Sequence, residues 1–186
     1  MKKKIIAVLI GIMLSVFSLS AQDAASRLGV ILNNFSPRAG FTTGAILKAD
    51  LDLIIQAAVR TNSARNSQPW FFTVVQDSTL VQKIVSQAVQ GNVLIVISTE
   101  GTTSREIIDC ALATQTIYLA AQALGYGSQI YTGPIERLNK EFKGDLGLPA
   151  NRNAVAIVRI GRVAAGVDAV SGASPRKDAK EIVTYK

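Results

Sequence analysis

An α+β fold, in which helices cover a β-sheet and one Ala-rich helix is buried, is predicted by three features of the 186-residue sequence. Segments with helical periodicity and segments rich in β-branched and aromatic residues are mixed along the chain. Val93–Ile97 is a continuous apolar run, typical of a fully buried strand. Ser104–Leu124 is long, mostly apolar and rich in alanine, which indicates a central helix buried on several sides. The length fits one domain.

The first 21 residues have the three-part layout of a secretory signal peptide. Lys2–Lys4 precede the apolar run Ile5–Phe17, and small residues lead to a cleavage site after Ala21. The alternative is a single transmembrane anchor, but spanning a bilayer takes ~20 apolar residues and this run is shorter. We therefore expect an exported protein, periplasmic or secreted, without a stable membrane anchor, whose mature domain is residues 22–186. Removing the three lysines lowers the net charge from +7 to +4.

The elements of the first half of the mature chain follow from local patterns. Asp23–Asn33 is predicted to be a short helix, and Ser36–Gly44 to be a loop because it contains Pro and Gly. Asp50–Val59 is an amphipathic helix with Leu51, Ile54, Ile55 and Ala58 on one face. After the irregular Thr61–Pro69, the residues Phe71–Val75 favour a strand. Ser78 can cap a helix that carries Leu80, Val81, Ile84, Val85 and Ala88 on one face.

The second half begins with the Val93–Ile97 strand and the central helix, which Gly125 and Gly127 are expected to end. A short strand, Ser128–Tyr131, follows, and Pro134 begins a small amphipathic helix. Further strands are predicted at Ala154–Ile160 and, after a loop rich in small residues, at Glu181–Tyr185. The sheet would then hold four or five strands.

Residue types that are missing limit the chemistry. The sequence has no His, which excludes His-ligated zinc and triads that use His as the base, and no metal site is expected. Its single Cys, Cys110, lies in an apolar segment and is interpreted as a buried apolar residue, the alternative being a reactive thiol. No run of Lys or Arg with interleaved aromatics indicates nucleic-acid binding. A bound organic cofactor would supply what the side chains lack.

The segment Asn62–Trp70 is the main candidate for such a cofactor. Its hydrogen-bonding side chains lie between a predicted helix and a predicted strand, where they can present amide and hydroxyl groups to a planar heterocycle. The alternative is an ordinary polar surface loop with Trp70 filling the core beneath it.

This segment resembles the helix-loop-strand signature of the nitroreductase family. The matching residues are Ser63, Asn66, Gln68, Pro69 and Trp70, followed by Phe72, Val74, Val75 and Asp77. The residue before Ser63, usually Pro in the family, is Asn62. The resemblance implies that Ser63, Ala64, Asn66 and Gln68 contact the ring and ribityl chain of FMN.

Two further segments extend the resemblance to the FMN phosphate. Ser36 and Arg38 fit the motif that binds it after the family's first helix, although Asn34 and Phe35 replace two basic residues. Arg guanidinium groups suit phosphate because they can donate two parallel hydrogen bonds. Arg176 matches the basic position near the C-terminus. For both arginines the alternative is an ordinary solvated charge.

The resemblance also places the backbone of Thr132 and Gly133 at the reactive edge of the flavin. It implies a mixed, mainly antiparallel sheet, an intertwined homodimer with FMN between the subunits, and a C-terminal tail that crosses to the partner. Only Ser98–Thr103 separate the buried strand from the central helix, so an open site is expected. The implied activity is ping-pong hydride transfer from a small-molecule donor to a nitroaromatic or quinone-like acceptor, with no catalytic side chain. Two alternatives remain: a flavin-binding exported protein without nitroreductase activity, and a flavin-free interaction protein that keeps the fold.

Overall fold

The structure is a computed structural model that describes residues 28–37, 39–167 and 176–186. Contacts divide the chain into two units, residues 1–34 and residues 35–186. In the described part of the first unit, only the short helix α2 (Gly29–Leu32) is formed, so the helix expected over Asp23–Asn33 is found only in part. The proposed signal peptide lies outside the described residues.

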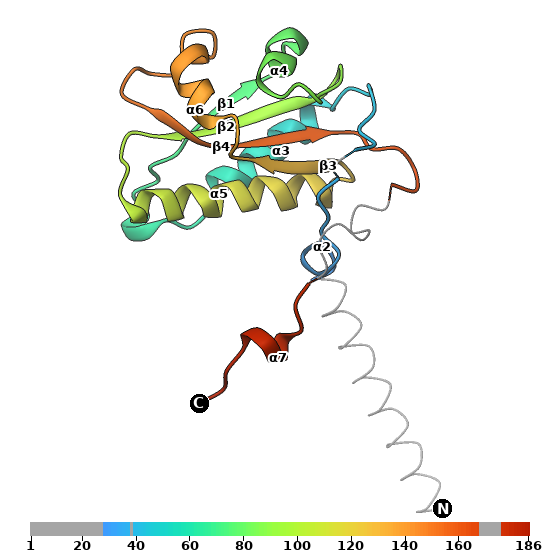
Figure 1. The fold of residues 1–186 in the computed structure, drawn as a ribbon, viewed down its shortest axis with the longest axis vertical. Helices are drawn as coiled ribbons and strands as arrows, with labels where there is room; N and C mark the ends of the chain where they lie inside the picture. Colours follow the sequence, from blue (N-terminus) through green and yellow to red (C-terminus); the bar gives the residue numbers. More distant parts are fainter. Residues whose placement is uncertain (1–27, 38, 168–175) are drawn as a thin grey trace, which may run out of the picture. The chain divides into compact units, whose positions relative to one another are not determined.

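A four-stranded sheet with the order β1-β2-β4-β3 forms the centre of the second unit (Figure 1). All three strand pairs are antiparallel. The strands are β1 (Phe71–Val75), β2 (Val93–Thr99), β3 (Gly127–Tyr131) and β4 (Asn153–Gly161). The four strands predicted from the sequence up to residue 161 are therefore confirmed, with β2 longer by two residues at its C-terminal end.

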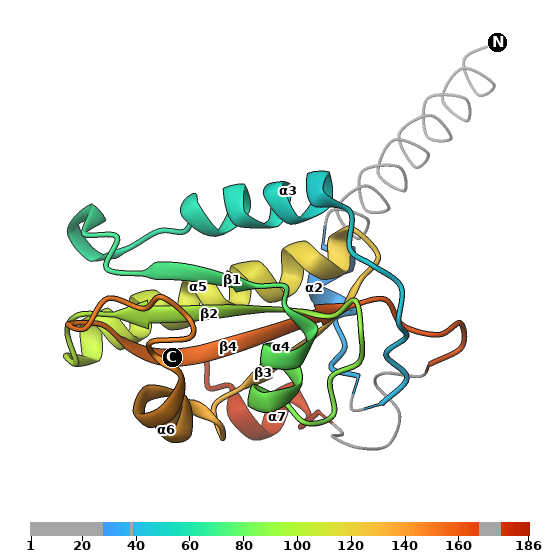
Figure 2. The same cartoon turned by 90° about the horizontal axis from the view of Figure 1, so that it is seen from above.

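Helices cover both faces of the sheet, as Figures 1 and 2 show. On one face lie α3 (Lys48–Val59) and the long α5 (Ser104–Ala123), which packs against both α3 and the strands. On the other face lie α4 (Ser78–Ile84) and α6 (Ile135–Arg137), the latter continued by the π-helical turn Leu138–Phe142. The α+β arrangement with a central Ala-rich helix is confirmed.

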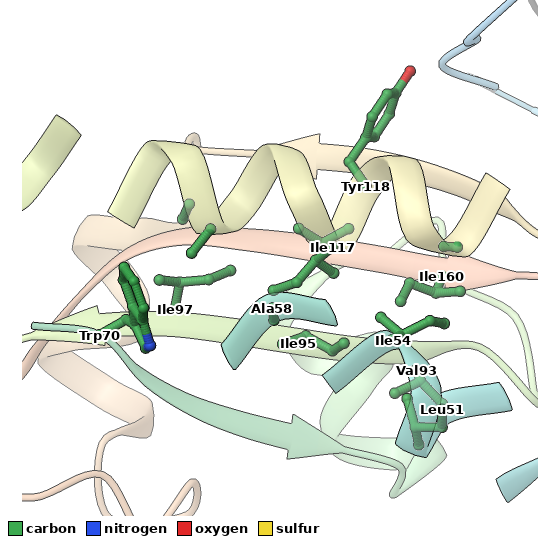
Figure 3. Close-up of a cluster of buried hydrophobic side chains, with 14 of the residues drawn as sticks. Leu51, Ile54, Ala58, Trp70, Val93, Ile95, Ile97, Ile117, Tyr118 and Ile160 are labelled. Carbon is green, nitrogen blue, oxygen red and sulfur yellow. The ribbon is translucent and has the colours of Figure 1, made fainter. Parts of the chain in front are cut away.

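Each face of the sheet has its own apolar core, because side chains alternate between the faces along a strand. Val93, Ile95 and Ile97 of β2 point to the α3–α5 side, where they meet Ile54 and Ile117 (Figure 3). The opposite core receives the alternate positions of the same strand together with residues of α4 and the π-helical turn: Leu94, Val96, Val81, Ile84 and Leu138. Both faces of β2 are therefore buried, which explains its unbroken apolar run.

Two details of the helices differ from the prediction. Asp77, and not Ser78, caps α4, because its carboxylate accepts a hydrogen bond from the Leu80 N–H at 2.8 Å. The helix ends at Ile84, although Val85 and Ala88 beyond it are buried as expected.

The predicted C-terminal strand Glu181–Tyr185 is wrong. Ala179–Ile182 form the short helix α7, and its first turn is closed by a capping box between Asp178 and Glu181. These local hydrogen bonds favour a helical turn over the β propensity of the apolar residues that follow. Residues 176–186 are all exposed, with Tyr185 at 94%.

The central helix α5 buries one side against the sheet and α3, and leaves large apolar residues on its other side. Ile108 is 58% exposed and Leu112 is 47% exposed, and Leu53 of α3 is 50% exposed. The prediction that α5 is buried on several sides is therefore not confirmed within a single chain. Among the described helices, none is both long and apolar enough to cross a membrane.

Candidate functional site

The loop between α3 and β1 is held in an unusual backbone conformation. Arg65, Asn66 and Gln68 have φ values of 57°, 53° and 44°, in the left-handed region that non-glycine residues rarely adopt. Each such residue typically costs about 1–3 kcal/mol, and such conformations gather at functional sites. Local hydrogen bonds offset the cost: Ser63 Oγ accepts from the Gln68 N–H at 3.0 Å, and the Gln68 amide donates to Asn66 Oδ1 at 3.2 Å.

Two buried or half-buried groups fasten this loop to the rest of the domain. The Ala64 N–H donates to Asp109 Oδ1 of α5 at 3.0 Å, and Arg152 donates to the Pro69 carbonyl at 3.1 Å while pairing with Glu100 at 2.8 Å. Trp70 is buried in the α3–α5 core beneath the loop. The loop is therefore rigidly anchored, yet it leaves the side-chain amides of Asn66 and Gln68 exposed.

Cys110, next to Asp109 on α5, is fully buried. Burial raises the pKa of its thiol to about 11, and the neighbouring Asp109 carboxylate adds to this rise. The thiol is therefore protonated at neutral pH and inaccessible, which confirms the interpretation as a buried apolar residue. Among the described residues, no group of three or more Cys, Asp or Glu side chains could hold a metal ion.

The predicted phosphate-binding loop lies at another part of the domain. Gln122 of α5 makes two hydrogen bonds with Phe35 at the start of this loop. The Gln122 Oε1 accepts from the Phe35 N–H at 2.9 Å, and the Gln122 Nε2 donates to the Phe35 carbonyl at 2.7 Å. Ser36 is exposed and Pro37 is buried. Arg38 lies outside the described residues. Arg176 is described and exposed, in the segment that precedes α7.

Thr132 and Gly133 follow β3 and are exposed beside a cavity of about 420 Å³. The cavity is lined by residues of the segment after α4, of β3 and of α6: Ile84, Val85, Ser86, Gln87, Tyr131, Gly133, Pro134 and Arg137. A side chain at Gly133 would meet no atom within 4 Å, so the backbone here is open to a ligand. None of the lining residues is acidic, which favours a neutral or anionic occupant.

The sheet separates the predicted site residues into two groups. The Ser63–Gln68 loop leads into β1, and Thr132 and Gly133 follow β3, so the two groups lie at opposite edges of the sheet (Figure 1). Neighbouring strands are about 4.8 Å apart, which puts three strand spacings, about 14 Å, between β1 and β3. One chain therefore does not bring these residues together around a single flavin ring.

Three residues that anchor the Asn62–Trp70 loop and the predicted phosphate-binding loop were not predicted from the sequence. Asp109, Arg152 and Gln122 anchor the loops through contacts between residues 45 to 87 positions apart in the chain, and no local pattern indicates them. Arg159, by contrast, stands out in the sequence itself. It is a lone charge in the apolar run Ala154–Ile160, and charged residues are rarely buried.

Comparison with known proteins places the chain in a family. Residues 87–162 match the family described as "Nitroreductase family". An Archaeoglobus fulgidus protein with the name "Putative NADH dehydrogenase/NAD(P)H nitroreductase" is 34% identical over 125 residues, which cover 60% of this chain and 71% of that protein. The chain belongs to the nitroreductase family, and this membership supports an oxidoreductase function.

Solved structures agree on the fold. A nitroreductase with bound FMN from Desulfitobacterium hafniense superposes with a TM-score of 0.70 at 23% identity, covering 86% of this chain and 97% of that one. A nitroreductase with bound FMN from Bacteroides fragilis gives a TM-score of 0.71 at 20% identity, with the same coverage of 86% and 97%. The nitroreductase-like fold expected from the sequence is thereby confirmed.

Proposed function

We propose that this chain is a homodimeric, FMN-dependent oxidoreductase that reduces nitroaromatic or quinone-like acceptors by ping-pong hydride transfer. The observation that carries the proposal is the strained Ser63–Gln68 loop, which keeps two amide side chains exposed on a rigid support. An amide offers a donor and an acceptor side by side, and such a pair matches the edge of a planar heterocycle. FMN bound there would supply the hydride-transfer chemistry that the side chains lack.

Different residues would bind different parts of the cofactor. Asn66 and Gln68 would bind the ring edge, and Ser63 keeps the loop in shape through its bond with the Gln68 N–H. Ser36, Arg38 and Arg176 would bind the phosphate, for which guanidinium groups are well suited. The exposed Thr132–Gly133 backbone would face the reactive edge, with the open Gly133 allowing close approach. No side chain has to move a proton in this scheme.

Two subunits would complete each site, because one chain keeps its two groups of residues at opposite edges of the sheet. The apolar residues left exposed on α3 and α5 support a homodimer, since contiguous exposed apolar surface commonly marks an interface. In such a dimer, the loop of one subunit would meet the Thr132–Gly133 segment and the phosphate-binding loop of its partner.

Subunit complementation tests this arrangement. Asn66→Ala and Arg38→Ala homodimers should each bind FMN weakly, since each has two damaged sites. A dimer formed from one subunit of each kind has one site with both defects and one site with neither. We expect such mixed dimers, purified with two different tags, to bind one FMN per dimer with the affinity of the unaltered protein. Mixed dimers that bind as weakly as either homodimer would contradict a site shared between subunits.

The absorption spectrum and enzymatic turnover distinguish the proposed function from its two alternatives. After incubation with FMN and desalting, the purified protein should keep a flavin spectrum with bands in the near-ultraviolet and the blue. A colourless protein that releases no heat on FMN addition would favour a flavin-free interaction protein. A flavin-loaded protein that fails to reduce a quinone or a nitroaromatic, with either NADH or NADPH as donor, would favour flavin binding without this activity.

We also propose that the chain is exported, on the strength of its first 21 residues. The mature protein should then be recovered outside the cytoplasm with Gln22 at its N-terminus. Full-length protein that stays in the cytoplasmic fraction would contradict the proposal.

A further inference from the structure

Arg159 is a charged side chain in the middle of β4 with only 1% of its surface exposed. It lies opposite Leu94 of β2 on one side and Gln129 of β3 on the other. In the part of the chain that the structure describes, no carboxylate lies within salt-bridge distance of its guanidinium group. Burying a charge without a partner of opposite charge is costly, so stability alone gives no reason for an arginine here.

The contacts of Arg159 join three separate segments. Its Nε donates to Asn92 Oδ1 at 2.8 Å, and a terminal nitrogen donates to the Gln87 carbonyl at 2.9 Å. The other terminal nitrogen lies 3.4 Å from the Tyr131 hydroxyl, and the guanidinium stacks 3.8 Å above the ring of Phe41. All four partners are neutral. They give each of its three nitrogens one acceptor and hold the group in place, but they leave its positive charge uncancelled.

Three of these partners lie beside segments that the proposed function assigns to FMN. Gln87 and Tyr131 line the cavity of about 420 Å³ beside Gly133. Phe41 lies in the loop that carries Ser36. The next residue of this loop, Thr42, donates a hydrogen bond from its N–H to the Arg162 carbonyl at 2.8 Å. Arg159 therefore contacts two residues of the cavity wall without lining the cavity itself, and it is buried where the interior screens charge less than water does.

We propose that Arg159 is a positioning residue for the cofactor, and that its charge makes the cavity favour reduced over oxidised FMN. This inference rests on the proposed function. Transfer of a hydride to the neutral oxidised ring adds two electrons and one proton, so the reduced ring carries one negative charge. A fixed positive charge behind the cavity stabilises that anion and has little effect on the neutral oxidised ring.

The test compares three variants with the unaltered protein. Arg159→Gln removes the charge and keeps hydrogen-bond donors, Arg159→Lys keeps the charge, and Arg162→Gln removes a charge from the exposed residue two positions further on as the matched control. The affinity for oxidised FMN is measured by fluorescence, and the reduction midpoint potential by dye equilibration. Together these give the ratio of the affinities for reduced and oxidised FMN.

Arg159→Gln should lower this ratio by about 10-fold, the order expected for removal of a partly screened unit charge. Arg159→Lys and Arg162→Gln should leave the ratio within about two-fold of the unaltered protein. An unchanged ratio in Arg159→Gln, or an equal fall in Arg162→Gln, would overturn the electrostatic role. Neither the affinity nor the midpoint potential depends on catalytic turnover.

Amide hydrogen exchange without flavin tests the positioning role by itself. The Val89 N–H donates to the same Asn92 oxygen that Arg159 holds, and the Thr42 N–H lies next to Phe41. Both amides should exchange faster in Arg159→Gln, while the amides of α5 keep their rates. Unchanged exchange at both would overturn the positioning role, even if Arg159→Gln is too loosely packed to keep flavin. If the unaltered protein binds no FMN, the proposed function fails, and the exchange result still decides whether Arg159 joins the three segments.

Discussion

Asp109 of the central helix accepts a hydrogen bond from the backbone N–H of Ala64, 3.0 Å away, and this contact holds the left-handed loop that presents Asn66. The carboxylate is only 3% exposed, and its second oxygen, Oδ2, has no hydrogen-bond partner within the described residues. A buried carboxylate with a free oxygen is costly. Among the described residues, the Ala64 N–H is the hydrogen-bond donor that offsets part of this cost.

Asp109→Ala should therefore weaken both the fold and flavin binding. It leaves the Ala64 N–H without an acceptor, which typically costs about 1–3 kcal/mol of unfolding free energy. Asp109→Asn is the matched control because it keeps an oxygen in the same place. Thermal unfolding and fluorescence titration with FMN compare the two. If Asp109→Asn loses as much flavin affinity as Asp109→Ala, Asp109 does not support flavin binding through the hydrogen bond that it accepts from Ala64.

Replacement of Asn66 separates the role of its amide from that of its backbone. Its φ of 53° is easy for glycine and strained for alanine. Both Asn66→Gly and Asn66→Ala remove the amide, so both should weaken FMN binding, whereas Asn66→Ala should also be less stable by about 1 kcal/mol. Isothermal titration and urea unfolding measure the two effects. Normal flavin affinity in Asn66→Gly would show that the side chain does not contact the ring.

Arg38→Ala should weaken FMN binding much more than riboflavin binding. Loss of a charge-assisted contact with the phosphate typically costs about 1.5–3 kcal/mol, and riboflavin has no phosphate. Both dissociation constants can be measured by quenching of flavin fluorescence. Equal losses for the two ligands would place Arg38 away from the phosphate.

Cys110 should resist alkylation in the native protein. With a thiol pKa of about 11, about one molecule in a thousand would carry the reactive thiolate at pH 8, and the side chain is also buried. Iodoacetamide labelling followed by mass spectrometry should therefore find little modification until urea unfolds the chain. Fast labelling of the folded protein at pH 8 would mean that α5 is exposed by local opening.

Ending the chain after Asp178 should shift the protein from dimer toward monomer. The removed segment contains Ile182 and Tyr185, which are 66% and 94% exposed and have apolar surface to bury against a partner. Flavin affinity should fall in parallel, because ligand binding and dimer formation stabilise each other by mass action. Sedimentation velocity of both forms at equal concentration measures the shift. A dimer that keeps its flavin content after truncation would show that this tail is not part of the interface.

Local patterns predicted most of the fold because its elements bury surfaces that repeat at fixed intervals. The run Val93–Ile97 is apolar at every position since β2 has a core on each face, and α3 carries its apolar residues at helical spacing. The tail was mispredicted because one pair, Asp178 and Glu181, forms a capping box that outweighs the β propensity of the next few residues.

The sequence by itself determined the family signature, the order of helices and strands up to residue 161, and the loop from Asn62 to Trp70. Each of these depends on residues that are close together in the chain. Only the tertiary structure decided that the Ser63–Gln68 loop and the Thr132–Gly133 segment lie at opposite edges of one sheet, because strand order is set by pairing between distant segments. The roles of Asp109 and Arg159 also needed the fold. A buried polar group is explained by its hydrogen-bond partners, and theirs come from residues 28 to 72 positions away.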